Sequence, residues 1–376
     1  MSRFDRYLLS QLMQLFGFFA LILVSVYWVN RAVQLFDQLI SDGQSARVFL
    51  EFTALTLPNV IRLVLPVAAF VAAVYATNRL SSESELVVMQ ATGFSPFRLA
   101  RPVVYFGLIV ALMMALLVHH LVPLSRAKLA ERRDEIAENI AERFLTEGQF
   151  VHPAGGITLY IRRITLDGQL HDIFLSDARD DARRTIYTAE RALLVRSETG
   201  PKLVMFDGMA QRVTGPERRL SLTRFDDFSY DVGALVTGLG ERHPTADELP
   251  TARLLWPDAA TEALTGAPAA ELRVAAHDRL SQPLLAVVAA LIGFATLLVG
   301  GFSRHGLTRQ IALAVALIIA IQFAVNSAAR IATAAPQMWP VLYLPGLAGL
   351  AIGAALLALA GRSRRPRHGP PPGVPA

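Results

Sequence analysis

Six long apolar runs constrain this chain more than any other feature of its sequence. A helix that crosses a bilayer needs about 20 apolar residues to span roughly 30 Å of hydrocarbon. Five runs of that length contain no Asp, Glu, Lys or Arg, and a sixth contains only Arg62. The runs cover residues 7–30, 52–78, 102–125, 281–303, 310–329 and 331–361. They predict six membrane-spanning helices, and the first is too long for the core of a cleaved signal peptide.

The low content of charged residues agrees with a membrane protein and argues against other classes. Charged residues make up 18% of the 376 residues, against roughly 25% in an average soluble domain. A net charge of +5 is too small to suggest a nucleic-acid partner. Without cysteine, the chain has no disulfide, cysteine-ligated metal or thiol nucleophile. Its two lysines follow Ala127 and Pro201, so neither completes a phosphate-binding loop.

Basic residues beside the apolar runs predict how the chain is oriented. Lys and Arg in short flanking segments favour the cytoplasmic side of a membrane. Here they precede the first run, separate the second from the third and the fourth from the fifth, and follow the sixth: Arg3, Arg6, Arg79, Arg98, Arg101, Arg304, Arg309, Arg362, Arg364, Arg365 and Arg367. All these segments lie on one side if every run crosses. We therefore expect both termini in the cytoplasm and residues 126–275 on the opposite side of the membrane.

The predicted fold class is a membrane α-helical protein of six transmembrane helices with an inserted all-β, jelly-roll-like periplasmic domain. Residues 1–125 and 276–361 carry three spans each. Between them, a charged helical stretch at 126–144 leads into short β-rich runs separated by turn residues, which is typical of an antiparallel sandwich or jelly roll. We expect residues 241–270 to return to the membrane in an extended form, and residues 362–376 to form a basic, Pro-rich cytoplasmic tail.

The sequence offers few groups for catalysis or metal binding. His119 and His120 are adjacent, and neighbouring positions on a helix do not face one another, so they make a poor metal pair. There is no nucleophile elbow of the form G-x-S-x-G, and no carboxylate in the six runs marks an ion-coupled carrier. We expect no catalytic residue, no metal site and no cofactor in this chain.

The loop between the second and third runs contains a short capped helix by its pattern. Ser82 and Glu85 match a capping box, in which each side chain satisfies a backbone N–H at a helix start. Gly93 followed by Pro96 is typical of a helix end. The pattern predicts a helix at about residues 82–92.

This short helix has more apolar character than a connector needs. We expect Leu86, Val87 and Met89 to be exposed on it. Such a helix can rest on the bilayer or fit the groove of a protein partner. Its acidic start favours the protein partner, since anionic lipid headgroups would repel Glu83 and Glu85.

Several stretches resemble one family of membrane proteins. The loop residues Ser84, Glu85, Leu86, Met89, Ala91, Gly93 and Ser95 are similar to the coupling-helix signature of the lipopolysaccharide export permeases, the LptF/LptG family. The amino-terminal Arg6-Tyr7-Leu8, the later Gly148-Gln149-Phe150 and the order of three spans, a domain and three spans also match. The resemblance therefore covers nearly the whole chain, and the loop and Gly148-Gln149-Phe150 resemble the LptF branch more than the LptG branch.

The resemblance implies a function and a set of partners. It implies a permease subunit of an ABC transporter in the inner membrane of a Gram-negative bacterium, paired as a heterodimer with an LptG-like second permease. A dimer of an LptB-like cytoplasmic ATPase would bind ATP, and an LptC-like membrane-anchored periplasmic protein would associate with the pair. The complex would extract lipopolysaccharide from the outer leaflet of the inner membrane and pass it to a periplasmic bridge.

The resemblance also implies roles for particular residues. The coupling glutamate that engages the ATPase corresponds to Glu85, with Glu83 as a weaker candidate, and the accompanying coupling residues are Leu86, Met89 and Gly93. Arg31, after the first span, corresponds to a basic residue near the lipid A headgroup. On the fifth span, relatives carry a basic residue where this chain has Asn326, and Arg330 one turn later can replace it. A membrane anchor would explain Arg31 equally well.

Two other classes of function remain open on the residues alone. An intramembrane hydrolase or lipid-modifying transferase would require reactive groups that converge at one membrane depth, and the sequence shows none. A scaffold or mechanotransmitter, coupled to a cytoplasmic ATPase without lipid transport, would need no lipid-binding cavity. Copurification of lipopolysaccharide would separate this second alternative from a permease.

Overall fold

The computed structural model describes most of the chain, as two compact units. The described residues are 3–41, 46–143, 147–152, 155–165, 168–180, 183–197, 200–214, 219–231, 243–299 and 307–362. One unit, the helical unit, comprises Met1–Ala127 and Pro244–Ala376, and the other, the β unit, comprises Lys128–His243. Arg304 and nearly all of the expected tail lie outside the described residues.

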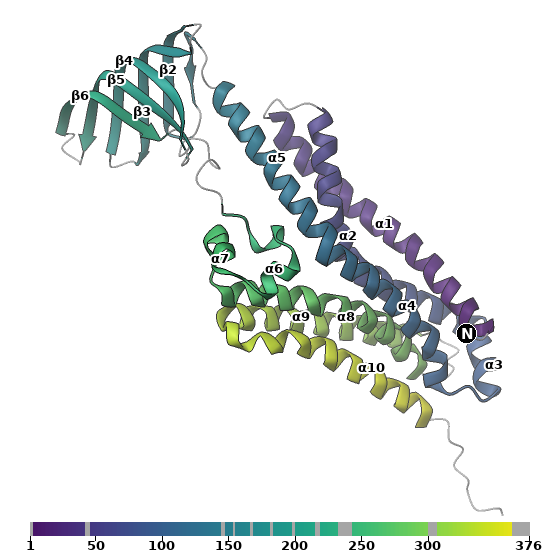
Figure 1. The fold of residues 1–376 in the computed structure, drawn as a ribbon. Coiled ribbons are helices and arrows are strands. Elements are labelled where there is room, and N and C mark those ends of the chain that lie inside the picture. The colour runs from purple at the N-terminus through teal and green to yellow at the C-terminus, as the bar shows by residue number, and fades with distance from the viewer. Residues whose placement is uncertain are drawn as a thin grey trace, which may run out of the picture. The chain divides into compact units, whose positions relative to one another are not determined.

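The described residues contain six helices that are long and apolar enough to cross a membrane, which confirms the helical part of the predicted fold class. The long helices are α1 (Arg3–Ser41), α2 (Ala46–Ser82), α4 (Pro96–Leu116), α5 (Val122–Arg143), α8 (Ala269–Val299), α9 (Thr308–Ala334) and α10 (Leu344–Arg362) (Figure 1). A π-helical turn, Leu117–Leu121, joins α4 to α5 as one continuous helix, and a 3-10 helix, Pro336–Tyr343, precedes α10. As the sequence predicts, the charged stretch after the third span prolongs that helix, to Arg143.

Helix α8 lies at the centre of the helical unit. It packs against α2, α4, α9 and α10, and 67% of its most apolar window is buried. Glycines of α10 allow the close approach of α10 to α8. A Cβ on Gly349 would lie 2.4 Å from Val288 Cγ1, and one on Gly353 would lie 2.6 Å from Leu291 Cδ2. Small residues at such positions let two helix backbones come together, as in many membrane proteins.

In the part of the β unit that the structure describes, six antiparallel strands form one curled sheet, and each pairs with its neighbours in sequence (Figure 1). The strands are β1 (Phe150–Val151), β2 (Ile157–Ile164), β3 (Gln169–Asp180), β4 (Arg183–Ser197), β5 (Gly200–Thr214) and β6 (Arg219–Asp231). Apolar side chains from one face make the core, including Leu159, Leu175 and Met205. An inserted all-β unit is thus confirmed, and its described strands form a single sheet rather than two facing sheets.

Two aspartates help to explain the curl of the sheet. Asp172 in β3 and Asp207 in β5 have positive φ values of 50° and 55°, which residues in a flat strand do not adopt. In β3 the buried positions change parity across Asp172, from Leu170 to Ile173. Beside Asp207, a Cβ on Gly208 would lie 2.4 Å from the Phe225 ring, so glycine permits the close approach of β6.

The segment after the β unit differs from the sequence prediction. From Pro244 it belongs to the helical unit, and it contains a 3-10 helix η2 (Ala246–Glu248) and two short helices, α6 (Thr251–Leu255) and α7 (Ala259–Thr265). The expected extended return is therefore wrong for residues 244–270. Local signals explain the helices: Thr245 and Glu248 form a capping box, and Asp258 accepts the Thr261 N–H at 2.8 Å.

Candidate functional site

The short helix α3 (Glu85–Ala91) lies between α2 and α4 and begins later than the sequence predicts. α2 continues to Ser82, and its Arg79 forms a 2.8 Å ion pair with Glu83 one turn later. Ser84 then adopts the left-handed conformation with φ 60° and separates the two helices. The expected helix end before Gly93 is confirmed, because α3 stops at Ala91 and Gly93 has φ +89°.

The predicted capping box of α3 is wrong. Ser82 Oγ donates to the Asn78 carbonyl at 2.9 Å, within α2, so it does not cap α3. The N-cap residue is Ser84, whose side chain makes no capping hydrogen bond. The sequence pattern failed here because Ser82 followed by Glu85 is equally compatible with one more turn of α2.

One face of α3 is buried and the opposite face is exposed. Leu86 is only 7% exposed and packs in the core of the helical unit, and Met89, one turn later, packs partly against the same core. The prediction that Leu86 is exposed is therefore wrong. Val87 and Val88 are 41% and 59% exposed on the other face, and the sequence reasoning missed Val88. We call Glu85, Val87 and Val88 the α3 surface.

The amino-terminal turns of α1 hold the start of α3. The Tyr7 hydroxyl donates to Glu85 Oε1 at 3.3 Å, and Gln11 Nε2 donates to the Tyr7 oxygen at 2.8 Å. The Phe4 ring meets the Phe94 ring edge-on, with centroids 6.0 Å apart. Sequence reasoning did not connect Tyr7 with Glu85, although the Arg6-Tyr7-Leu8 match was a signal that this end of α1 has a specific role.

The predicted ATPase-coupling residues and the predicted lipid-binding residues lie at different depths of the helical unit. Glu83, Glu85, Leu86, Met89 and Gly93 all lie in or beside α3. Arg31 follows Tyr7 by 24 residues on the continuous helix α1, which corresponds to about 36 Å along the helix axis. That length exceeds the hydrocarbon thickness of roughly 30 Å, so Arg31 lies near the opposite end of the span.

A polar stripe on α9 includes the second predicted lipid-binding residue. Gln322, Asn326 and Arg330 recur every four residues and are exposed on the helical unit. Gln322 Nε2 lies 3.4 Å from Asn326 Oδ1. Because four residues make about one helical turn, the three side chains lie on one face of α9. Polar groups at membrane depth mark a protein interface or a water-filled cavity, so this face is not suited to lipid tails alone.

The described residues provide no metal centre. They contain no group of three or more His, Cys, Asp or Glu side chains that could hold a metal ion. His119 Nδ1 lies 3.0 Å from Thr251 Oγ1, so this histidine takes part in a hydrogen bond.

Comparisons with known proteins agree with the sequence resemblance. The family described as lipopolysaccharide export system permease LptF/LptG matches residues 6–359. An uncharacterized protein of Rickettsia prowazekii is 23% identical over 329 residues, which is 86% of this chain and 90% of that protein. LptF of Escherichia coli is 24% identical over 62% of this chain and 64% of its own length, and LptG of Haemophilus influenzae is 28% identical over 33% and 34%.

Proposed function

Because the chain belongs to the LptF/LptG family of lipopolysaccharide export permeases, we propose that it is the LptF-type subunit of an ATP-driven lipopolysaccharide transporter. The match to E. coli LptF covers 62% of this chain, whereas the match to H. influenzae LptG covers 33%. This difference in coverage supports the LptF assignment. An LptG-like permease would then complete the membrane part of a heterodimer, and an LptC-like protein would associate with it.

The proposal that an ATPase binds this chain rests on the α3 surface. α3 is anchored by its buried face, and it presents two exposed valines beside a carboxylate on a short connection between two spans. A groove on an LptB-like ATPase can bury the valines, while a basic residue in that groove pairs with Glu85. Glu83 is the weaker candidate because Arg79 already pairs with it.

The orientation of the chain follows from the same proposal. An ATPase dimer binds ATP in the cytoplasm, so α3 and the amino-terminal end of α1 face the cytoplasm. The far end of α1, with Arg31, then faces the periplasm, and so does the β unit. Both termini are cytoplasmic in this arrangement, and the protein spans the inner membrane of a Gram-negative bacterium.

The proposed substrate contacts lie on α1 and α9. Only 11% and 17% of the most apolar windows of these spans are buried, so both helices have faces available to a partner or a lipid. Arg31 and Arg330 would meet the phosphates of lipid A, because a guanidinium can make two parallel hydrogen bonds to one phosphate. The polar stripe around Asn326 supports a cavity on this face of α9.

Glu85→Lys tests the ATPase contact. The substitution places a positive charge where the proposal needs a negative one, so copurification of the ATPase should fall by about tenfold or more. Gln90→Ala is the matched control, because Gln90 lies in the same helix and its Nε2 has no hydrogen-bond partner among the described residues. Unchanged ATPase copurification and unchanged lipopolysaccharide export in Glu85→Lys would contradict the proposal.

Single cysteines test the orientation, since the chain contains none of its own. Val88 in α3 and Leu222 in β6 are 59% and 60% exposed, so a cysteine fits both positions. In cells with a permeabilised outer membrane, an impermeant thiol reagent should label Leu222→Cys and leave Val88→Cys unlabelled. The reverse pattern would overturn the orientation. Copurification of lipopolysaccharide with the assembled complex separates a permease from a scaffold that transports no lipid.

A further inference from the structure

A buried arginine of α8 holds the segment that returns from the β unit. Arg279 is 3% exposed, and its Nη1 donates to the Leu249 carbonyl at 2.8 Å while its Nη2 donates to the Ala246 carbonyl at 2.7 Å. Nη1 also lies 3.4 Å from Thr251 Oγ1. One planar guanidinium thus bonds three groups of η2 and the start of α6. Loss of these bonds would leave a buried charge without its carbonyl partners, so we expect this contact to stay closed.

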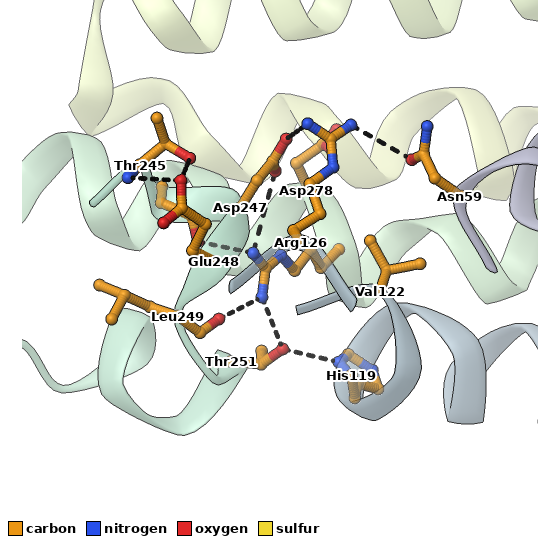
Figure 2. Close-up of polar contacts among 12 residues, drawn as sticks. Asn59, His119, Val122, Arg126, Thr245, Asp247, Glu248, Leu249, Thr251 and Asp278 are labelled. Atoms are coloured by element: carbon orange, nitrogen blue, oxygen red, sulfur yellow. Dashed lines mark hydrogen bonds and ion pairs between the residues drawn. The ribbon is translucent and has the colours of Figure 1, made fainter. Parts of the chain in front are cut away.

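A second arginine joins the outgoing connection to the same segment. Arg126, in α5, forms a 3.4 Å ion pair with Asp247 and donates to Asn59 Oδ1 of α2 at 3.3 Å (Figure 2). Asp247 also lies 3.9 Å from Arg279 Nη2, so one carboxylate bridges the two arginines. The two chain segments that lead to and from the β unit are therefore fastened to each other, to α2 and to α8.

The π-helical turn makes the third attachment. In Figure 2, Thr251 lies between Leu249 and His119, and its hydroxyl is 3.0 Å from His119 Nδ1. His119 belongs to the π-helix Leu117–Leu121, and such turns occur frequently at functional sites. We call Arg279, Asp247, Arg126, Thr251 and His119 the clasp.

A continuous helix connects the clasp with the α3 surface. α4 begins at Pro96, after a connection of four residues from α3, and the helix runs without a break through the π-helical turn into α5. Arg126 follows Pro96 by 30 residues, or about 45 Å along the axis. A displacement of α3 can therefore reach the clasp along one continuous helix.

We propose that the clasp passes ATP-driven movement of the spans to both chain segments that lead to the β unit, with Arg279 as its central positioning residue. The proposal rests on the proposed function, because it needs an ATPase at α3 and lipid export as the output. In a complex with a loosened clasp, the helices still respond to ATP, but the return segment no longer follows α8. Hydrolysis then continues while less lipid is delivered for each ATP.

Arg279→Lys is the variant that tests the clasp most directly. Lysine keeps the charge, but its compact ammonium lacks the planar fork that reaches both carbonyls. Arg273→Lys is the matched control, since Arg273 is exposed on the same helix and, among the described residues, bonds only the Ala269 carbonyl of that helix, at 3.3 Å. Thr251→Val is a second variant that removes the hydroxyl shared by Arg279 and His119 and keeps the side-chain shape.

The assembled complex, reconstituted with both permeases, the ATPase and lipopolysaccharide, gives two measurements. The first is lipopolysaccharide released per ATP hydrolysed, which should fall about fivefold in Arg279→Lys and about twofold in Thr251→Val, with hydrolysis itself within about twofold of wild type. The second is amide hydrogen exchange of residues 245–255, which should become about tenfold faster in Arg279→Lys while the amides of α7 remain unchanged. Arg273→Lys should alter neither quantity.

The two measurements distinguish failure of the clasp from failure of the proposed function. Equal lipid release per ATP in Arg279→Lys and Arg273→Lys would overturn the clasp, and so would unchanged amide exchange of residues 245–255. The clasp proposal would also be overturned if ATP hydrolysis and lipopolysaccharide release fell by the same factor, because a loosened clasp should lower the amount of lipid released per ATP. If wild-type complex hydrolyses ATP but releases no lipopolysaccharide, the proposed function is wrong, while the exchange measurement still tests the clasp by itself.

Discussion

The two units of the chain bury apolar side chains in different ways. In the β unit, apolar residues such as Leu175 and Met205 gather on one face of the sheet and are fully buried. In the helical unit, α8 is mostly buried, but α1 and α9 direct most of their apolar side chains outward, among them Phe18 and Phe323 at 58% and 74% exposure. A soluble protein rarely exposes apolar surface on this scale.

This difference shows which solvent each unit requires. The hydrophobic effect holds the β unit together in water, because its folding removes apolar surface from water. Lipid tails are as apolar as leucine, so burial gives no such gain between spans, and the helices depend on close packing of small residues. Gly349 and Gly353 against α8 are examples of that packing.

We expect the largest effect when the β unit is expressed without the helical unit. Residues 128–243, expressed alone, should fold in aqueous buffer, give a β-type circular dichroism spectrum and unfold cooperatively in urea, because the core of this unit is its own. The full chain should aggregate without detergent or lipid. If the separated β unit remained unfolded, its stability would depend on the rest of the chain, and the contrast between the units would not hold.

A smaller effect is expected from overpacking the helical unit. Gly349→Leu should destabilise it by about 3 kcal/mol, because the added side chain meets Val288 at a distance that no real Cβ adopts. Gly17→Leu on α1 is the control, since a Cβ there meets nothing within 4 Å. Thermal unfolding in detergent measures both variants. Equal melting temperatures would show that α10 does not need close contact with α8.

Much of this fold follows from local patterns in the sequence. The six spans were predictable because the thickness of hydrocarbon sets a length that can be counted in residues. The strands were predictable as short β-rich runs between turns. The curl of the sheet was not, because nothing in the identities of Asp172 and Asp207 requires a positive φ. The helices after Pro244 were missed although Thr245 and Glu248 match a capping box, since the composition there favoured an extended segment.

The candidate site was less predictable because its contacts join distant parts of the chain. The sequence located α3, but the burial of Leu86 depends on the core of α1, α2 and α4 that it meets. Tyr7 and Glu85 are 78 residues apart, and no local pattern links them. Arg279 follows Asp278 near the start of a span, and a snorkelling anchor would have the same sequence signature. Only the carbonyls of Ala246 and Leu249, which Arg279 binds, distinguish a buried arginine that holds the return segment from a snorkelling anchor.

The pH dependence of the separated β unit should show the effect of one partly buried polar contact. Asp177 accepts hydrogen bonds from Arg179 Nη2 at 2.7 Å and from the Tyr230 hydroxyl at 2.8 Å, and these bonds lower the pKa of Asp177. Burial, together with the bond to Asp177, raises the pKa of Tyr230. The contribution of Asp177 is therefore present above its ordinary pKa of about 3.9 and is lost as the pH falls through the lowered value.

For Tyr230 the sign is opposite. Its contribution is present below about pH 10 and is lost as the pH rises through the raised value, so these two groups should not change the free energy of unfolding between about pH 5 and pH 9. Asp177→Asn should lower the free energy of unfolding by about 1–2 kcal/mol at pH 7 and should reduce its further decrease at low pH. Asp172→Asn is the control, because Asp172 forms an exposed ion pair with Arg162 and asparagine tolerates its positive φ. An equal loss in both variants would contradict a special role for Asp177. Urea titrations across the pH range measure these changes.

The smallest expected effect compares two tyrosines that each donate a hydroxyl to a carboxylate, one in each unit. Tyr230 is 7% exposed and lies 2.8 Å from Asp177, whereas Tyr7 is 43% exposed and lies 3.3 Å from Glu85. Tyr230→Phe should therefore cost the β unit about 1–2 kcal/mol, and Tyr7→Phe should cost the helical unit less than about 0.5 kcal/mol, because water competes for an exposed hydroxyl.

The Tyr7 hydroxyl nevertheless restricts the Glu85 side chain, so its loss should weaken ATPase binding about two- to threefold, measured by titration of the complex. The same substitution in a Glu85→Gln background should change ATPase binding little further, because the carboxylate that Tyr7 positions is already gone. A loss of stability in Tyr7→Phe as large as that in Tyr230→Phe would show instead that this contact maintains the fold of the helical unit and does not serve the α3 surface.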